Sequence, residues 1–239
     1  MQPYSARLDP HTIGMLLRGE PGFVRAWTDA HGLAPLLRAV AIVCFGAGLY
    51  GAAMGWWRAP LQGLFVAIKF PMIVLLTALG NALLNAMLAP LLGLNITLRQ
   101  TILAVMLSFA IAAIVLGAFS PLIAFLVWNV PAMSPEIVRG TTYSVIQLTH
   151  VAVIAFAGVT ANVRLFRLLA SLGGNAAVAR RVLFAWLAGN LLLGTQLTWV
   201  LRPFIGSPVL PVQFLRPTAF QGNFYETVIR AVLKTLETN

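Results

Sequence analysis

The stretch LYGAAMGWWRAPLQGLFVAIKFP, residues 49–71, decides how this chain folds. It begins inside an apolar segment and passes Trp56, Trp57 and Arg58. It then continues through apolar residues to Lys69, and its final proline opens a second apolar segment. Tryptophans and basic side chains are typical of the boundary between lipid and water. We therefore interpret Trp56, Trp57, Arg58 and Lys69 as interfacial anchors at a corner between two membrane-spanning helices.

The composition of the whole chain is consistent with that corner. Hydrophobic residues make up 59% of the 239 residues and charged residues only 9%. A soluble domain carries about a quarter charged residues, so this chain cannot cover itself with a solvated surface. Lipid must cover much of it, and its length has room for about five or six spans but for no large soluble domain.

Five apolar segments are long enough to cross a bilayer, and they predict an all-α, polytopic transmembrane helix bundle. The spans are expected at 36–57, 71–94, 101–128, 143–165 and 182–201, within a transmembrane domain of residues 36–205.

Two places in this domain depart from a simple span. Residues 58–69 are too short to cross, and their apolar side chains repeat at helical spacing, so we expect a short helix lying in the membrane interface. Pro121 falls inside the third span and predicts a kink there. A broken or re-entrant helix at Pro121, of the kind found at transport sites, is the alternative.

The two ends of the chain are less apolar than the spans. Residues 1–35 form an amphipathic segment that either lies in the interface or packs on the bundle as a cytosolic tail. Residues 206–239 comprise a proline-rich segment and a short amphipathic helix, whose expected start at Asn223 resembles a capping box.

Small residues four apart predict close contacts between helices. Gly51 and Gly55 form such a pair in the first span, and Ala157 and Ala161 form another in the fourth. Because these residues carry little or no side chain, a second backbone can approach closely.

Polar side chains inside the spans form a second set, because amides and imidazoles in lipid need partners. They are Asn81, Asn85, Gln147, His150, Asn190 and Gln196. Either they join pairs of helices by hydrogen bonds or they line one shared cavity as a polar face. We interpret His150 as a hydrogen-bonded packing residue rather than a proton carrier.

The net charge of +10 is assigned to the membrane surface rather than to nucleic acid. With five spans, most basic residues fall on the side of the N-terminus, which the positive-inside rule places in the cytoplasm. They are Arg7, Arg18, Arg25, Arg38, Arg99, Arg164, Arg167, Arg180 and Arg181, whereas the opposite loops carry Arg58, Lys69 and Arg139. The basic residues of the C-terminal segment, Arg202 and Arg216 among them, do not follow this rule, so either the rule is relaxed there or the span count differs by one.

Several short motifs resemble a family of uncharacterised bacterial polytopic membrane proteins of about five spans. The motifs are LLRGE, LYGAAMG, KFP, TLRQ, LRPFIGSP and GNFYE, and they are spread over most of the chain. The span count and the LYG near the first span are also loosely similar to Yip1-like proteins. The resemblance implies a membrane-scaffold or trafficking-type role. The preference for arginine over lysine indicates a GC-rich bacterial genome, and we expect the protein in the bacterial inner membrane.

The residues needed for catalysis are missing from the expected spans. None of the six acidic residues lies within a span, and the chain contains no HExxH, GxSxG or Walker A motif. We therefore expect no enzyme, no cofactor and no metal site. The sequence favours a non-catalytic structural or accessory subunit, with lipid and other membrane subunits or further copies of itself as partners. The alternative is a half-size ABC-like permease that works with a separate ATPase.

Overall fold

In a computed structural model, the chain forms a bundle of long helices, and the structure describes residues 10–173, 175–226 and 229. These residues contain eight helices and no strand. The helices are α1 (Pro10–Arg18), α2 (Pro21–Asp29), α3 (Ala34–Trp56), α4 (Pro60–Leu91), α5 (Leu98–Asn129), α6 (Pro135–Arg139), α7 (Thr141–Gly173) and α8 (Ala176–Leu201).

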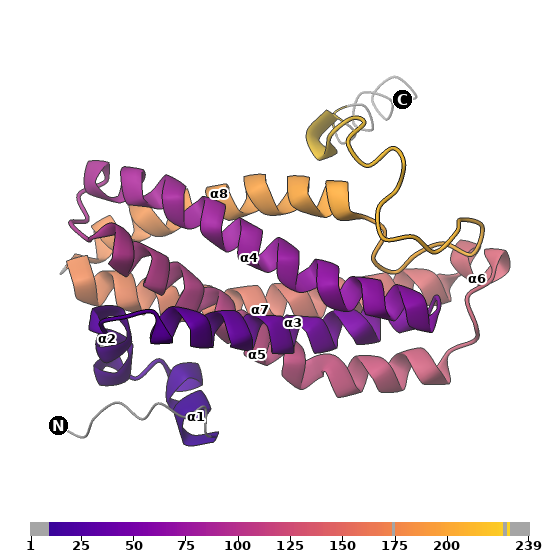
Figure 1. The fold of residues 1–239 in the computed structure, drawn as a ribbon, viewed down its shortest axis with the longest axis horizontal. Helices are drawn as coiled ribbons and strands as arrows, with labels where there is room; N and C mark the ends of the chain where they lie inside the picture. The colour runs from indigo at the N-terminus through magenta and orange to yellow at the C-terminus, as the bar shows by residue number, and fades with distance from the viewer. Residues whose placement is uncertain (1–9, 174, 227–228, 230–239) are drawn as a thin grey trace.

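Five helices, α3, α4, α5, α7 and α8, are long and apolar enough to cross a membrane. The all-α bundle with five spans that the sequence predicts is thus confirmed. The chain runs back and forth, so α1 and α2 lie at one end of the bundle and residues 202–226 at the other (Figure 1). Helices of 32 residues such as α4 and α5 are about 48 Å long. This length exceeds a hydrocarbon core of about 30 Å, so they must tilt or protrude.

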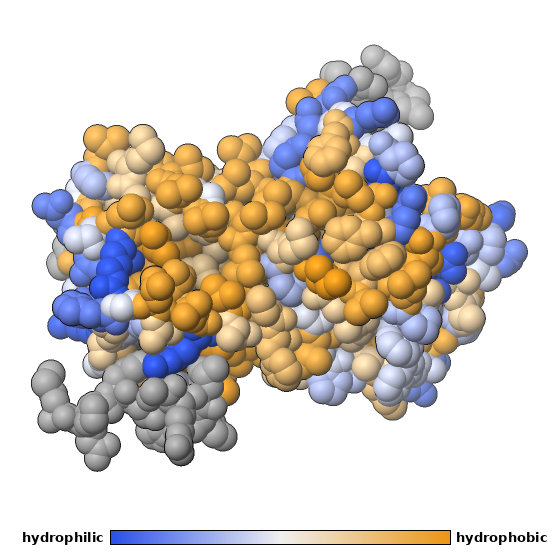
Figure 2. Space-filling view, viewed as in Figure 1, coloured by the Kyte–Doolittle hydropathy of each residue, from blue (hydrophilic) through white to orange (hydrophobic). Residues whose placement is uncertain are grey.

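The surface carries the pattern that a lipid-covered bundle requires. Figure 2 shows a hydrophobic band across the middle of one face, with hydrophilic residues gathered toward both ends. Large side chains of the spans, such as Phe45, Phe125 and Phe184, are more than half exposed. Lipid is the environment in which such exposure carries no penalty.

The prediction of a separate interfacial helix at 58–69 is wrong, because α4 is continuous from Pro60 to Leu91. Pro60 starts the helix where a missing N–H costs nothing. The first turns of α4 then pack on the glycine face of α3. A Cβ on Gly51 would lie 2.6 Å from the Val66 carbonyl oxygen, and one on Gly55 would lie 2.6 Å from that of Gln62. The close contact therefore involves the segment that looked like a surface helix.

A broken third span is also contradicted, because α5 is one helix that contains Pro121. A proline cannot donate to the carbonyl four residues earlier, which here belongs to Gly117. The Ser120 hydroxyl donates to that carbonyl instead, at 2.6 Å. The orphaned backbone group is thus satisfied locally, as it must be in lipid. At its start, α5 has a full capping box between Thr97 and Gln100.

The N-terminal helices pack against the end of the bundle. Leu16 and Trp27 are fully buried in the same hydrophobic cluster as residues of α5 and α7. Arg99, at the start of α5, donates to the Gly32 carbonyl at 2.9 Å. This is the arrangement of a tail packed on the bundle, the second of the two that the sequence left open.

The C-terminal helix is described only at its first turn. The Glu226 N–H donates to the Asn223 side chain at 2.7 Å, as a helix start at Asn223 requires. The amphipathic helix expected beyond it lies outside the described residues.

Candidate functional site

The expected interfacial anchors lie in different environments. Trp56 is 46% exposed, as an anchor should be. Trp57 is buried, and its indole N–H donates to the Pro131 carbonyl at 3.1 Å. Lys69 is fully buried within α4, where it contacts other parts of the protein. Because α4 is continuous, Lys69 lies about two and a half turns from the first residue of the helix, Pro60.

Arg58 and two side chains of α4 hold the segment that follows α8, residues 203–214, which we call the C-terminal strap. Arg58 donates to the carbonyls of Ser207 at 2.8 Å and Leu210 at 3.3 Å. Gln62 donates to those of Pro203 and Phe204, at 3.0 and 2.9 Å.

Lys69 is the third holder of the C-terminal strap. Its ammonium nitrogen is 3.3 Å from the Pro203 carbonyl oxygen and 5.1 Å from the centre of the Phe214 ring. A buried lysine is costly without such partners. The sequence shows these basic residues but not their targets, which lie more than a hundred positions away.

Three of the expected polar residues meet between α4 and α8. The Asn81 amide donates to the Asn190 side-chain oxygen at 2.7 Å and to the Trp186 carbonyl at 3.2 Å. Asn85 donates to the Asn81 carbonyl at 2.7 Å. A Cβ on Gly189 would lie only 2.5 Å from the Asn81 side-chain oxygen, so a glycine is needed opposite this amide.

His150 belongs to a different contact, between α3 and α7. Its Nδ1 lies 2.9 Å from the Tyr50 hydroxyl, and the two rings meet edge to face. Both side chains are buried. The sequence predicts a packing role for His150 but does not identify Tyr50 as its partner. The available signal was a lone hydroxyl-bearing ring in the middle of an uncharged span.

The two remaining polar residues join neither contact. Gln196 accepts a hydrogen bond from the Phe224 N–H at 3.2 Å, which ties the start of the C-terminal helix to α8. Gln147 is exposed. The predicted polar face is therefore divided among separate contacts.

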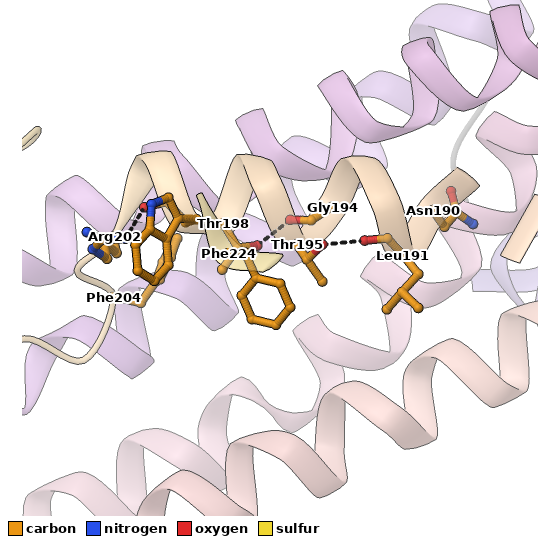
Figure 3. A pocket seen from close by; sticks show the side chains of 9 residues that line it. Asn190, Leu191, Gly194, Thr195, Thr198, Arg202, Phe204 and Phe224 are labelled. Carbon is orange, nitrogen blue, oxygen red and sulfur yellow. Dashed lines mark hydrogen bonds between the residues drawn. The ribbon is translucent and has the colours of Figure 1, made fainter. Parts of the chain in front are cut away.

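Two cavities lie beside α8. One, of about 460 Å³, is lined by residues of all five spans, mainly by apolar side chains, with Thr77, Asn162 and Asn190 among the few polar ones. The other, of about 390 Å³, follows α8 from Asn190 to Arg202 (Figure 3). We call this second cavity the α8 groove. Both volumes are within the range of ligand sites, roughly 300–1,000 Å³.

The hydroxyl groups in these cavities are mostly satisfied within the helix. Thr195 and Thr198 donate to the carbonyls of Leu191 and Gly194, at 2.6 and 2.7 Å. The Thr77 hydroxyl is buried and has no hydrogen-bond partner in the described part of the chain. Among those same residues, no group of three or more His, Cys, Asp or Glu side chains could hold a metal ion. The cavities therefore offer a largely apolar surface.

Comparisons with protein-family models, with curated proteins and with solved structures find no match to this chain. The fold itself defines the class, a multi-pass helical membrane protein with five candidate spans.

Proposed function

We propose that this chain is a non-catalytic structural or accessory subunit of a membrane assembly. One observation carries the proposal: the polar side chains that bond across spans do so in separate helix pairs and not along one shared path. Asn81 and Asn190 join α4 to α8, and Tyr50 and His150 join α3 to α7. Such bonds stabilise a bundle by about 0.6 kcal/mol each on average, which is a structural role.

The permease alternative needs a route for a polar solute, and the cavities do not favour it. Their threonine hydroxyls are mostly bonded to their own backbone, and their walls are mainly apolar. An intramembrane route for ions or protons also requires ionisable groups at depth. Lys69, the charged residue buried in α4, contacts the C-terminal strap instead of lining either cavity.

We further propose a bacterial inner membrane as the location, with the N-terminus in the cytoplasm. The end of the bundle that carries α1 and α2 holds more basic residues than the other end, as the positive-inside rule expects. In the described residues these are Arg18, Arg25, Arg38, Arg99, Arg164, Arg167, Arg180 and Arg181, against Arg58, Lys69, Arg139, Arg202 and Arg216 at the strap end.

The subunit proposal is tested by isolating the tagged chain from its native membrane in polymer-bounded lipid discs and measuring the stoichiometry of bound proteins by mass spectrometry. An unrelated tagged membrane protein from the same cells is the control. We expect at least one other membrane protein in a fixed ratio and no ATPase. A stoichiometric ATPase would support the permease instead, and recovery of this chain alone would contradict the subunit proposal.

A further inference from the structure

We propose that the α8 groove binds one membrane lipid with an anionic headgroup, the acyl chain lying along α8 from Asn190 to Thr198 and the headgroup meeting Arg202 and Arg216. This inference does not depend on the proposed function, because a lipid site is compatible with a subunit, a carrier or a channel.

The length of the α8 groove matches the thickness of one lipid leaflet. The groove follows α8 from Asn190 to Arg202, and twelve residues of helix rise about 18 Å. One leaflet of the hydrocarbon core is about 15 Å thick, half of the roughly 30 Å total. The groove is therefore about as long as a leaflet is thick, and it ends where α8 ends.

The walls of the α8 groove are mainly apolar. Leu191, Phe204 and Phe224 line the groove, and its threonines have already used their hydroxyls within α8. Figure 3 shows these side chains along α8, with Arg202 at the end opposite Asn190. An open apolar groove in a bilayer offers water no partners, so a hydrocarbon chain is its natural content.

The groove also adjoins the larger cavity, which residues of all five spans line. Asn190, Gly194, Thr198 and Phe204 line both spaces. A second acyl chain therefore has room beside the first, as a diacyl lipid requires.

The end of the α8 groove at Arg202 carries positive charge. Arg202 is half-buried and stacks on Trp199, with its guanidinium carbon 3.4 Å from the ring centre. Burial lowers the pKa of Arg202, and the nearby positive charge of Arg216 lowers it further. In the part of the chain that the structure describes, neither arginine forms an ion pair with a carboxylate. Two adjacent cations without an anion favour a phosphate, which arginine binds in a bidentate manner.

This site also accounts for an exception in the distribution of charge. The positive-inside rule leaves Arg202 and Arg216 unexplained, because with five spans they lie on the side opposite the N-terminus. A specific headgroup contact gives both residues a role that does not depend on that rule.

The test measures lipid binding to the purified full chain by native mass spectrometry, with phosphatidylglycerol and phosphatidylcholine as probes. We expect the wild-type chain to retain phosphatidylglycerol preferentially. Hydrogen bonds to a charged group contribute about 1.5–3 kcal/mol, so the double variant Arg202→Gln/Arg216→Gln should lose phosphatidylglycerol affinity about tenfold or more. Its phosphatidylcholine binding should fall less, because that headgroup carries the same phosphate but no net charge.

Two further variants keep this test falsifiable. Arg139→Gln removes an exposed arginine at the same end of the bundle but outside the groove, and it should leave the preference intact. Thr198→Phe fills the groove at an exposed position, and it should weaken the binding of both lipids. Arg216→Gln alone serves if the double variant does not fold, because it leaves the contact between Arg202 and Trp199 in place.

Three results would overturn the proposal. One is equal binding of the two lipids by the wild-type chain. Another is an equal loss of phosphatidylglycerol binding in Arg139→Gln, because this would indicate general surface charge. The third is a Thr198→Phe chain that binds both lipids normally but no longer copurifies with a membrane protein, which would assign the groove to a partner helix.

Discussion

At the scale of single residues, glycines determine how closely α3 approaches its neighbours. Gly51 and Gly55 face the backbone of α4, while Gly46 faces that of α5 at Ala113. The spacing of Gly51 and Gly55 is visible in the sequence as a contact motif. Gly46 is not part of that motif. It lies on the face of α3 that contacts α5, whereas the four-residue spacing marks only the face that contacts α4.

We predict that Gly46→Ala and Gly55→Ala each destabilise the bundle. The new methyl group would overlap the Ala113 carbonyl in the first case and approach the Gln62 carbonyl oxygen to 2.6 Å in the second. Overpacking of this kind costs about 1–3 kcal/mol, and a lower melting temperature in mild detergent would report it. The control is Gly158→Ala, where a Cβ has nothing within 4 Å and no loss is expected. Equal melting of all three variants would contradict close packing of α3.

The Tyr50–His150 contact is the second feature at this scale. We predict that Tyr50→Phe and His150→Phe are not additive, because each alone removes the hydrogen bond between α3 and α7. Intramembrane hydrogen bonds couple by about 0.6 kcal/mol on average and at most about 1.7 kcal/mol. A double-mutant cycle on the unfolding free energy measures this coupling. A coupling near zero would show that the two side chains do not depend on each other.

At the scale of elements, the packing of α8 on α4 depends on a glycine placed opposite an amide. We predict that Gly189→Ala is destabilising in the wild-type chain and much less so when Asn81 is replaced by Ala. The reason is that the added methyl group would lie 2.5 Å from the Asn81 side-chain oxygen. Melting temperatures of the two single variants and the double variant measure this rescue. An equal cost of Gly189→Ala in both backgrounds would exclude the contact.

The elements also indicate what sequence reasoning can and cannot recover. Five spans follow from hydropathy and length, because lipid imposes both. The start of α4 does not follow, because Arg58, Pro60 and Lys69 look like the boundaries of an interfacial segment. Their roles come from contacts with the C-terminal strap, and no local pattern encodes a partner that far along the chain. The sequence identifies Asn81 and His150 as polar residues inside the spans. Only the packing of the helices shows that they belong to two separate contacts.

At the scale of the whole molecule, the two ends of the bundle differ in the elements and charges that they carry. The N-terminal end carries α1 and α2 (Figure 1) and the larger share of the basic residues in the described part of the chain. The opposite end carries the C-terminal strap and the α8 groove, where half-buried Arg202 adjoins an apolar wall. The polar groups between these ends join helix pairs within the bundle, which is consistent with the structural role that we propose.

The most direct test of this account is the accessibility of cysteines placed in the spans. Thr77→Cys and Asn190→Cys, each made without the native Cys44, place thiols on the cavity that residues of all five spans line. A membrane-impermeant maleimide is then applied to sealed vesicles of both orientations. Asn129→Cys at the exposed end of α5 is the positive control, and the wild-type chain, with Cys44 in the middle of α3, is the negative control. The account predicts labelling of Asn129→Cys alone, whereas labelling at position 77 or 190 from either side would show a water-filled path and contradict it.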